Sequence, residues 1–135
     1  MAVYVDDTIR DFTYRRYDLE SVDVENIWLQ VKIGGGPPIF LASVYRNPFS
    51  GFVWFDEFIS MMDRAQDHKH MNNILLLGDF SIDTFTSNAA WESTLSRFNV
   101  HQCVQSPTRV TLTTILIVYL LIIYMLTTQT KKIHT

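Results

Sequence analysis

An aspartate that directly follows an aliphatic run is the residue best placed for chemistry in this sequence. Residues 74–77 are all Ile or Leu, and Gly78 and Asp79 come next. A carboxylate at the end of a buried strand can bind a divalent cation or position a water molecule, and the glycine permits a tight backbone turn. The alternative is a loop carboxylate that caps a nearby amide, which the residues support equally well.

Three further residues extend this candidate site. Tyr45 ends another apolar run, so its hydroxyl could donate to a phosphate oxygen; the alternative is an aromatic ring with its tip in water. Ser81 and Asp83 follow Asp79 at alternate positions, and in an extended chain all three would face the same way. A shared face would concentrate polar groups beside the aspartate.

Other chemistries receive little support. His68 and His70 flank a lysine without a third ligand nearby in the sequence, which favours a solvated turn over a metal pair. The sequence contains no CxxC pair, HExxH motif or Gly-rich phosphate loop. A formal net charge of −3 argues against a protein that mainly neutralises many phosphates. Cys103, the single cysteine, predicts a small buried side chain and a reducing intracellular compartment, nuclear or cytoplasmic.

The elements that position Tyr45 follow from local patterning. Alternating apolar residues over 24–33 predict a strand with one buried face, and the glycines and prolines of 34–38 end it. Residues 39–45 are apolar at nearly every position, so they predict a central strand that forms an antiparallel hairpin with the first.

A helix and a third strand position Asp79. Apolar residues three and four apart predict an amphipathic helix over 52–66, and 73–77 predict a strand. A strand, helix and strand in this order form a crossover between parallel strands, whose carboxyl ends share one edge. Tyr45 and Asp79 are therefore expected to lie close together at the edge where open α/β sheets bind ligands.

The two ends of this central unit are patterned differently. Val3 and Val5 predict a strand at the amino terminus, and Ser87 or Asn88 is expected to cap a second helix. That helix buries a stripe formed by Trp91, Leu95 and Phe98. Basic and acidic residues are interspersed over 6–20, which predicts a mixed solvated surface.

Several motifs in this order resemble the endonuclease/exonuclease/phosphatase superfamily, and most closely the endonuclease domains of non-LTR (LINE-type) retrotransposons. The resemblance covers residues 2–114, so the expected organisation is a domain over 1–114 and a divergent apolar tail over 115–135. The motifs are VENIWLQVKI (24–33), SVYRNP (43–48), the amphipathic helix, ILLLGDFSID (74–83) and QSPTRVT (105–111).

The resemblance implies an α/β fold, a four-layer sandwich represented here in part and truncated at both ends. It also implies Mg²⁺-dependent hydrolysis of a DNA phosphodiester by water. Tyr45 matches the tyrosine that helps hold the phosphate, and Asp79 matches a catalytic aspartate that binds the metal. Ser81 stands where the family has asparagine, and losing one such donor costs a factor of about 10² to 10³ in rate.

Other family residues have no counterpart here. The family's metal-binding glutamate and an asparagine precede the part that this chain resembles, and a Ser-Asp-His signature follows it. Val118 or Tyr119 lies near the position of another family aspartate. A single carboxylate holds Mg²⁺ weakly, so we expect hydrolysis to be weak or absent.

The apolar tail allows two interpretations. A helix over residues 112–128 would span about 25 Å, short of a hydrocarbon core of about 30 Å, and Lys131 and Lys132 follow it at a possible headgroup surface. The alternative is a partly buried or degenerate segment. The runner-up function is accordingly a non-catalytic domain remnant held at a membrane by this tail.

Overall fold

The computed structural model describes residues 1–68, 73–82 and 88–104. The chain divides into two compact units, Met1–Val100 and His101–Thr135, and the fold reported below is that of the first unit. The expected domain boundary at 114/115 and the apolar segment 112–128 lie outside the described residues. Among the described helices, none is long and apolar enough to cross a membrane.

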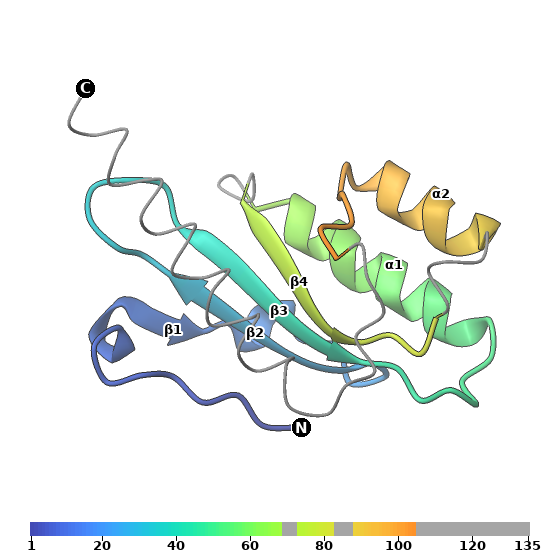
Figure 1. The fold of residues 1–135 in the computed structure, drawn as a ribbon, viewed down its shortest axis with the longest axis horizontal. Helices are drawn as coiled ribbons and strands as arrows, with labels where there is room; N and C mark the ends of the chain where they lie inside the picture. The colour runs from blue at the N-terminus through green and yellow to red at the C-terminus, as the bar shows by residue number, and fades with distance from the viewer. Residues whose placement is uncertain (69–72, 83–87, 105–135) are drawn as a thin grey trace. The chain divides into compact units, whose positions relative to one another are not determined.

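A mixed sheet of four strands forms the centre of the first unit (Figure 1). The strand order is β1-β2-β3-β4; the first two pairings are antiparallel, and β3 and β4 are parallel. The predicted hairpin and the central place of its second strand are both confirmed. The strands are β1 (Thr13–Arg15), β2 (Glu25–Val31), β3 (Ile39–Tyr45) and β4 (Ile74–Asp79).

Two α-helices lie on one side of this sheet (Figure 1). Helix α1 (Val53–Gln66) is the predicted crossover between the parallel strands. Helix α2 (Ala89–Arg97) begins after Asn88, whose side chain accepts a hydrogen bond from the Trp91 amide at 3.1 Å. Ser87, the other expected cap, lies outside the described residues. Two short 3-10 turns, η1 (Arg10–Phe12) and η2 (Tyr17–Leu19), flank β1.

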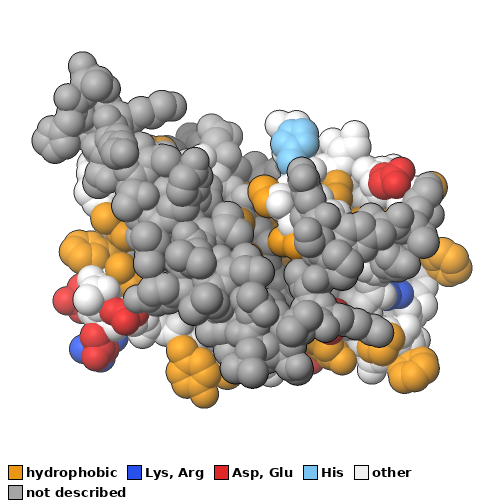
Figure 2. Space-filling view, in the orientation of Figure 1, with side chains coloured by type: hydrophobic (Ala, Val, Ile, Leu, Met, Phe, Trp, Pro, Cys, Tyr) orange, Lys and Arg blue, Asp and Glu red, His pale blue; other side chains and the backbone are white. Residues whose placement is uncertain are grey.

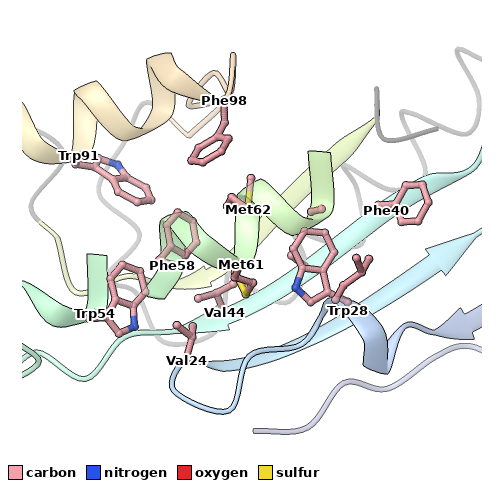
Figure 3. Close-up of a cluster of buried hydrophobic side chains, with 13 residues drawn as sticks. Val24, Trp28, Phe40, Val44, Trp54, Phe58, Met61, Met62, Trp91 and Phe98 are labelled. Atoms are coloured by element: carbon pink, nitrogen blue, oxygen red, sulfur yellow. The ribbon is translucent and has the colours of Figure 1, made fainter. Parts of the chain in front are cut away.

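The core is layered from the sheet through α1 to α2 (Figure 3). Phe58 of α1 is buried, stacks on Trp54 with ring centroids 5.0 Å apart, and meets Trp91 of α2 at 6.0 Å. Phe80, just beyond β4, lies 4.9 Å from Trp91. Since buried apolar area contributes about 25 cal/mol per Å², these large rings are a main source of stability. The sheet contributes Trp28, Phe40, Ala42 and Val44 to this core.

The opposite face of the sheet is also aliphatic. Side chains alternate along a strand, so the residues between those of the core point to the other face. They are half-buried, apart from Leu29, which is buried. The members of this face are Ile27, Leu29 and Val31 of β2, Ile39 and Leu41 of β3, and Leu75 and Leu77 of β4. The α/β class is confirmed, whereas the four-layer sandwich stays a prediction.

Two predictions about individual segments are wrong. Residues 1–7 form no strand, because the chain turns at Asp6, whose Oδ1 accepts hydrogen bonds from the amide and hydroxyl of Thr8 at 2.9 and 2.6 Å. The first strand is instead β1, paired with the far end of β2. Cys103 is exposed rather than buried, so its apolar character did not decide its position.

Candidate functional site

Tyr45 and Asp79 lie opposite each other at the ends of β3 and β4. They are register partners in the parallel pair, and the Arg46 amide donates to the Asp79 carbonyl at 2.8 Å. Val44 points into the helical core, so the next residue, Tyr45, projects from the opposite face and is 38% exposed. The structure thus brings together the tyrosine and aspartate that the crossover predicted to be neighbours.

Gly78 is required by a close approach between strands. Its φ is +139°, and a Cβ at this position would collide with the carbonyl oxygen of Val44. The sequence suggested a glycine that permits a tight turn. The stricter reason is that β3 passes too near for any side chain, which fixes Asp79 against its neighbouring strand.

The Asp79 carboxylate caps the turn that follows it. Its Oδ1 accepts hydrogen bonds from the Ser81 amide at 2.8 Å and from the Ser81 hydroxyl at 3.3 Å. This is the capping alternative considered for Asp79, and it uses one carboxylate oxygen. Within the described residues no contact is seen for Oδ2, so capping and ligand binding are compatible.

Ser81 does not continue an extended chain. Its φ is +47°, in the left-handed region, so the expectation that it shares an extended face with Asp79 is wrong. Asp83, the third residue of that expected face, lies outside the described residues. The Ser81 hydroxyl is instead directed at the carboxylate it follows, which makes it a second donor to Asp79.

Glu25 of β2 lies in register with Tyr45 and Asp79, so the three polar residues form a row across neighbouring strands. It is the register partner of Tyr45 on the antiparallel side, and its Oε1 accepts from the amino group of Met1 at 2.8 Å. Neighbouring strands lie about 4.8 Å apart, so Glu25 and Asp79, which lie on either side of β3, are about two strand spacings apart, whereas two oxygens bound to one Mg²⁺ lie within about 4.2 Å. The two carboxylates could share an ion only if both side chains bent across Tyr45.

Several arginines elsewhere in the unit form ion pairs with carboxylates. Where side chains are coloured in Figure 2, Lys and Arg are sparse and some adjoin acidic side chains. The hydrogen bond from Arg16 holds the pKa of the Asp18 carboxyl below its usual range. The predicted mixed surface is confirmed by three pairs: Arg10 with Asp7 at 3.1 Å, Arg15 with Glu20 at 2.8 Å, and Arg16 with Asp18 at 2.6 Å.

The donor set fits a weakly held Mg²⁺. No cluster of three or more His, Cys, Asp or Glu residues that could hold a metal occurs in the described parts of the chain. Mg²⁺ keeps several waters and is commonly bound through one or two carboxylates, so Asp79 Oδ2 could supply one ligand. His68 instead lies 3.4 Å from Asp18, and His70 is outside the described residues.

No protein-family model, curated protein or solved structure matches this chain. A functional assignment therefore depends on its own residues and their geometry.

Two residues at this edge were not singled out by their sequence. Counting back through the hairpin reaches Glu25 only once the register is known, in which Val31 pairs with Ile39 and Glu25 with Tyr45. Arg46 follows Tyr45 and donates to loop carbonyls on both sides of the edge. No periodicity signals such a contact, because its acceptors are backbone atoms of distant residues.

Proposed function

We propose that this chain derives from the endonuclease/exonuclease/phosphatase superfamily and that its Tyr45–Asp79 edge binds the phosphodiester of DNA together with Mg²⁺. The observation that supports this most directly is the register pairing of Tyr45 with Asp79 at the carboxyl edge of two parallel strands. A phenol donor and a carboxylate, side by side and facing the same way, suit a phosphate oxygen and its cation.

The strands around this edge give a second line of support. Sheets buried on both faces have strands that are apolar throughout, and β3 carries aliphatic side chains on the face opposite the helices as well as on the core face. A sandwich with a second sheet over that face, as the resemblance implies, would use such a strand. The resemblance to the non-LTR retrotransposon endonucleases is consistent with this geometry.

Each residue would have a distinct role. Asp79 would hold Mg²⁺ through Oδ2, and the ion would supply charge stabilisation to the phosphate. Tyr45 would donate a hydrogen bond from its hydroxyl to a phosphate oxygen. Ser81 already donates to Asp79, so it orients the carboxylate and is a poor replacement for an asparagine that reaches the phosphate.

We expect hydrolysis to be slow or absent in this chain. Asp79 contributes one carboxylate with one oxygen already engaged, and the Glu25 carboxylate lies on the far side of β3. An ion held this weakly spends little time bound at ordinary Mg²⁺ concentrations. Binding at the edge is therefore the more informative property to measure.

The test is a titration of the isotope-labelled chain with Mn²⁺, a paramagnetic substitute for Mg²⁺, followed by amide NMR. We expect broadening centred on residues 79–81 that disappears in Asp79→Asn. Broadening that persists in this variant would overturn the proposed metal site.

A plasmid assay tests the expected rate. Supercoiled DNA with Mg²⁺ should be nicked no faster than in the Asp79→Ala control. Efficient nicking that is lost in Asp79→Ala would support the assignment to the superfamily and contradict the expected low activity.

A further inference from the structure

Arg46 ties together the two loops that leave the Tyr45–Asp79 edge. Its Nη2 donates to the Ser50 carbonyl at 2.8 Å, in the loop between β3 and α1. Its Nη1 donates to the Ser81 carbonyl at 3.2 Å and lies 3.5 Å from the Phe80 carbonyl, both after β4. One planar guanidinium therefore joins segments more than thirty residues apart in the sequence.

The guanidinium is also held by aromatic rings at the start of α1. Its Cζ lies 5.6 Å from the centre of the Trp54 ring and 5.4 Å from that of Phe55. Its Nε is buried without a hydrogen-bond partner, and no carboxylate pairs with Arg46 anywhere in the described chain. Because the Arg46 guanidinium contacts carbonyls and rings, its role is to hold the two loops in place rather than to neutralise an acid.

We propose that Arg46 is a positioning residue that holds the turn after β4, so that the Asp79 carboxylate stays aligned beside Tyr45. The Arg46 amide holds the Asp79 carbonyl, and its guanidinium holds the carbonyls of the next two residues. The Ser81 amide and hydroxyl are thereby kept on Asp79 Oδ1, which leaves Oδ2 for a ligand. The ligand-binding consequence rests on the proposed function, whereas the positioning itself does not.

A positioning role and a simple charge effect predict opposite results. Removing a positive charge near Asp79 should strengthen cation binding if charge alone matters. Losing the hydrogen bonds from Arg46 to the turn should instead weaken cation binding, by about tenfold for a residue that orients a metal ligand. Arg46→Met keeps the apolar stem and removes the charge, and Arg46→Lys keeps the charge but loses the planar fork.

The first measurement needs no metal. We expect amide hydrogen exchange of Ser81 to become about tenfold faster in both Arg46 variants, because the guanidinium no longer holds the turn that carries this amide. The matched control is Arg97→Met, which removes an arginine that contacts Asp63 on the helical side. Unchanged exchange at Ser81 in both Arg46 variants would overturn the proposal.

The second measurement is the Mn²⁺ titration of residues 79–81. Both Arg46 variants should bind Mn²⁺ about tenfold more weakly than the unmodified chain, and Arg97→Met should not differ from it. Tighter or equal binding in Arg46→Met would overturn positioning in favour of charge. If the unmodified chain shows no Mn²⁺ effect, the proposed metal site is wrong and the Ser81 exchange alone decides the role of Arg46.

A third measurement uses the unmodified chain, in case the variants fail to fold. An arginine held by three carbonyls should show restricted rotation about its Cζ–Nη bonds, seen as separate Nη resonances for Arg46. Free rotation, as in a solvated arginine, would overturn the proposal without any substitution.

Discussion

Tyr45 and Asp79 end adjacent parallel strands as register partners, on the sheet face opposite the helices. Glu25 faces the same tyrosine from the antiparallel side, so the phenol is flanked by an acidic residue on each neighbouring strand. Tyr45 belongs both to the β2–β3 hairpin and to the β3–α1–β4 crossover. The arrangement places an aromatic donor between two carboxylates that the backbone holds apart.

Replacing Gly78 should disrupt this edge. In Gly78→Ala the new methyl group meets the Val44 carbonyl, and the backbone conformation at φ +139° is one that alanine disfavours. We expect a loss of more than about 2 kcal/mol in the free energy of unfolding, measured by urea titration of tryptophan fluorescence. Gly51→Ala is the matched control, because a Cβ there meets nothing within 4 Å.

Removing the Trp91 ring should loosen helix α2. The side chain is 6% exposed and contacts the rings of Phe58 and Phe80. Trp91→Ala should lower the free energy of unfolding by about 3–5 kcal/mol. The exposed neighbour Glu92 gives the control, since Glu92→Ala should change stability by under about 0.5 kcal/mol. Equal effects of the two substitutions would contradict the packing described.

The cap of α2 can be tested separately from its packing. Asn88 Oδ1 accepts from the Trp91 amide at 3.1 Å, and Asn88→Ala should cost about 1 kcal/mol in the free energy of unfolding. Asn88→Ser keeps an acceptor at this position and should recover most of that loss. Urea titration of both variants would show whether the side-chain oxygen, rather than asparagine itself, matters.

The Arg16–Asp18 pair predicts a small acid-side loss of stability. Hydrogen bonding to Arg16 lowers the pKa of Asp18 in the folded chain, so its stabilising effect is present above the unfolded pKa and disappears as pH falls through the folded value. The loss should come below about pH 4. Because the carboxylate is half-exposed, we expect under about 1 kcal/mol. Asp18→Asn should remove this part of the pH dependence in urea titrations between pH 2 and 7.

Local patterning determined much of the fold. The alternation in β2, the apolar run of β3 and the three-four spacing of α1 each report which side of an element is buried, so the hairpin, the crossover and the closeness of Tyr45 to Asp79 followed from them. The amino-terminal segment escaped this logic. Val3 and Val5 have the spacing of a strand, but the Asp6 turn leaves them without one.

Tertiary structure alone decided how the edge is assembled. The partner of Asp79 Oδ1, the loop carbonyls around Arg46 and the carboxylate opposite Tyr45 all depend on atoms that are distant in sequence or on side chains that turn back on the chain. Periodicity fixes the face of an element on which a side chain lies, because it reflects burial. It does not fix strand register or the hydrogen bonds of a loop, because these depend on which backbone atoms the folded chain brings within reach.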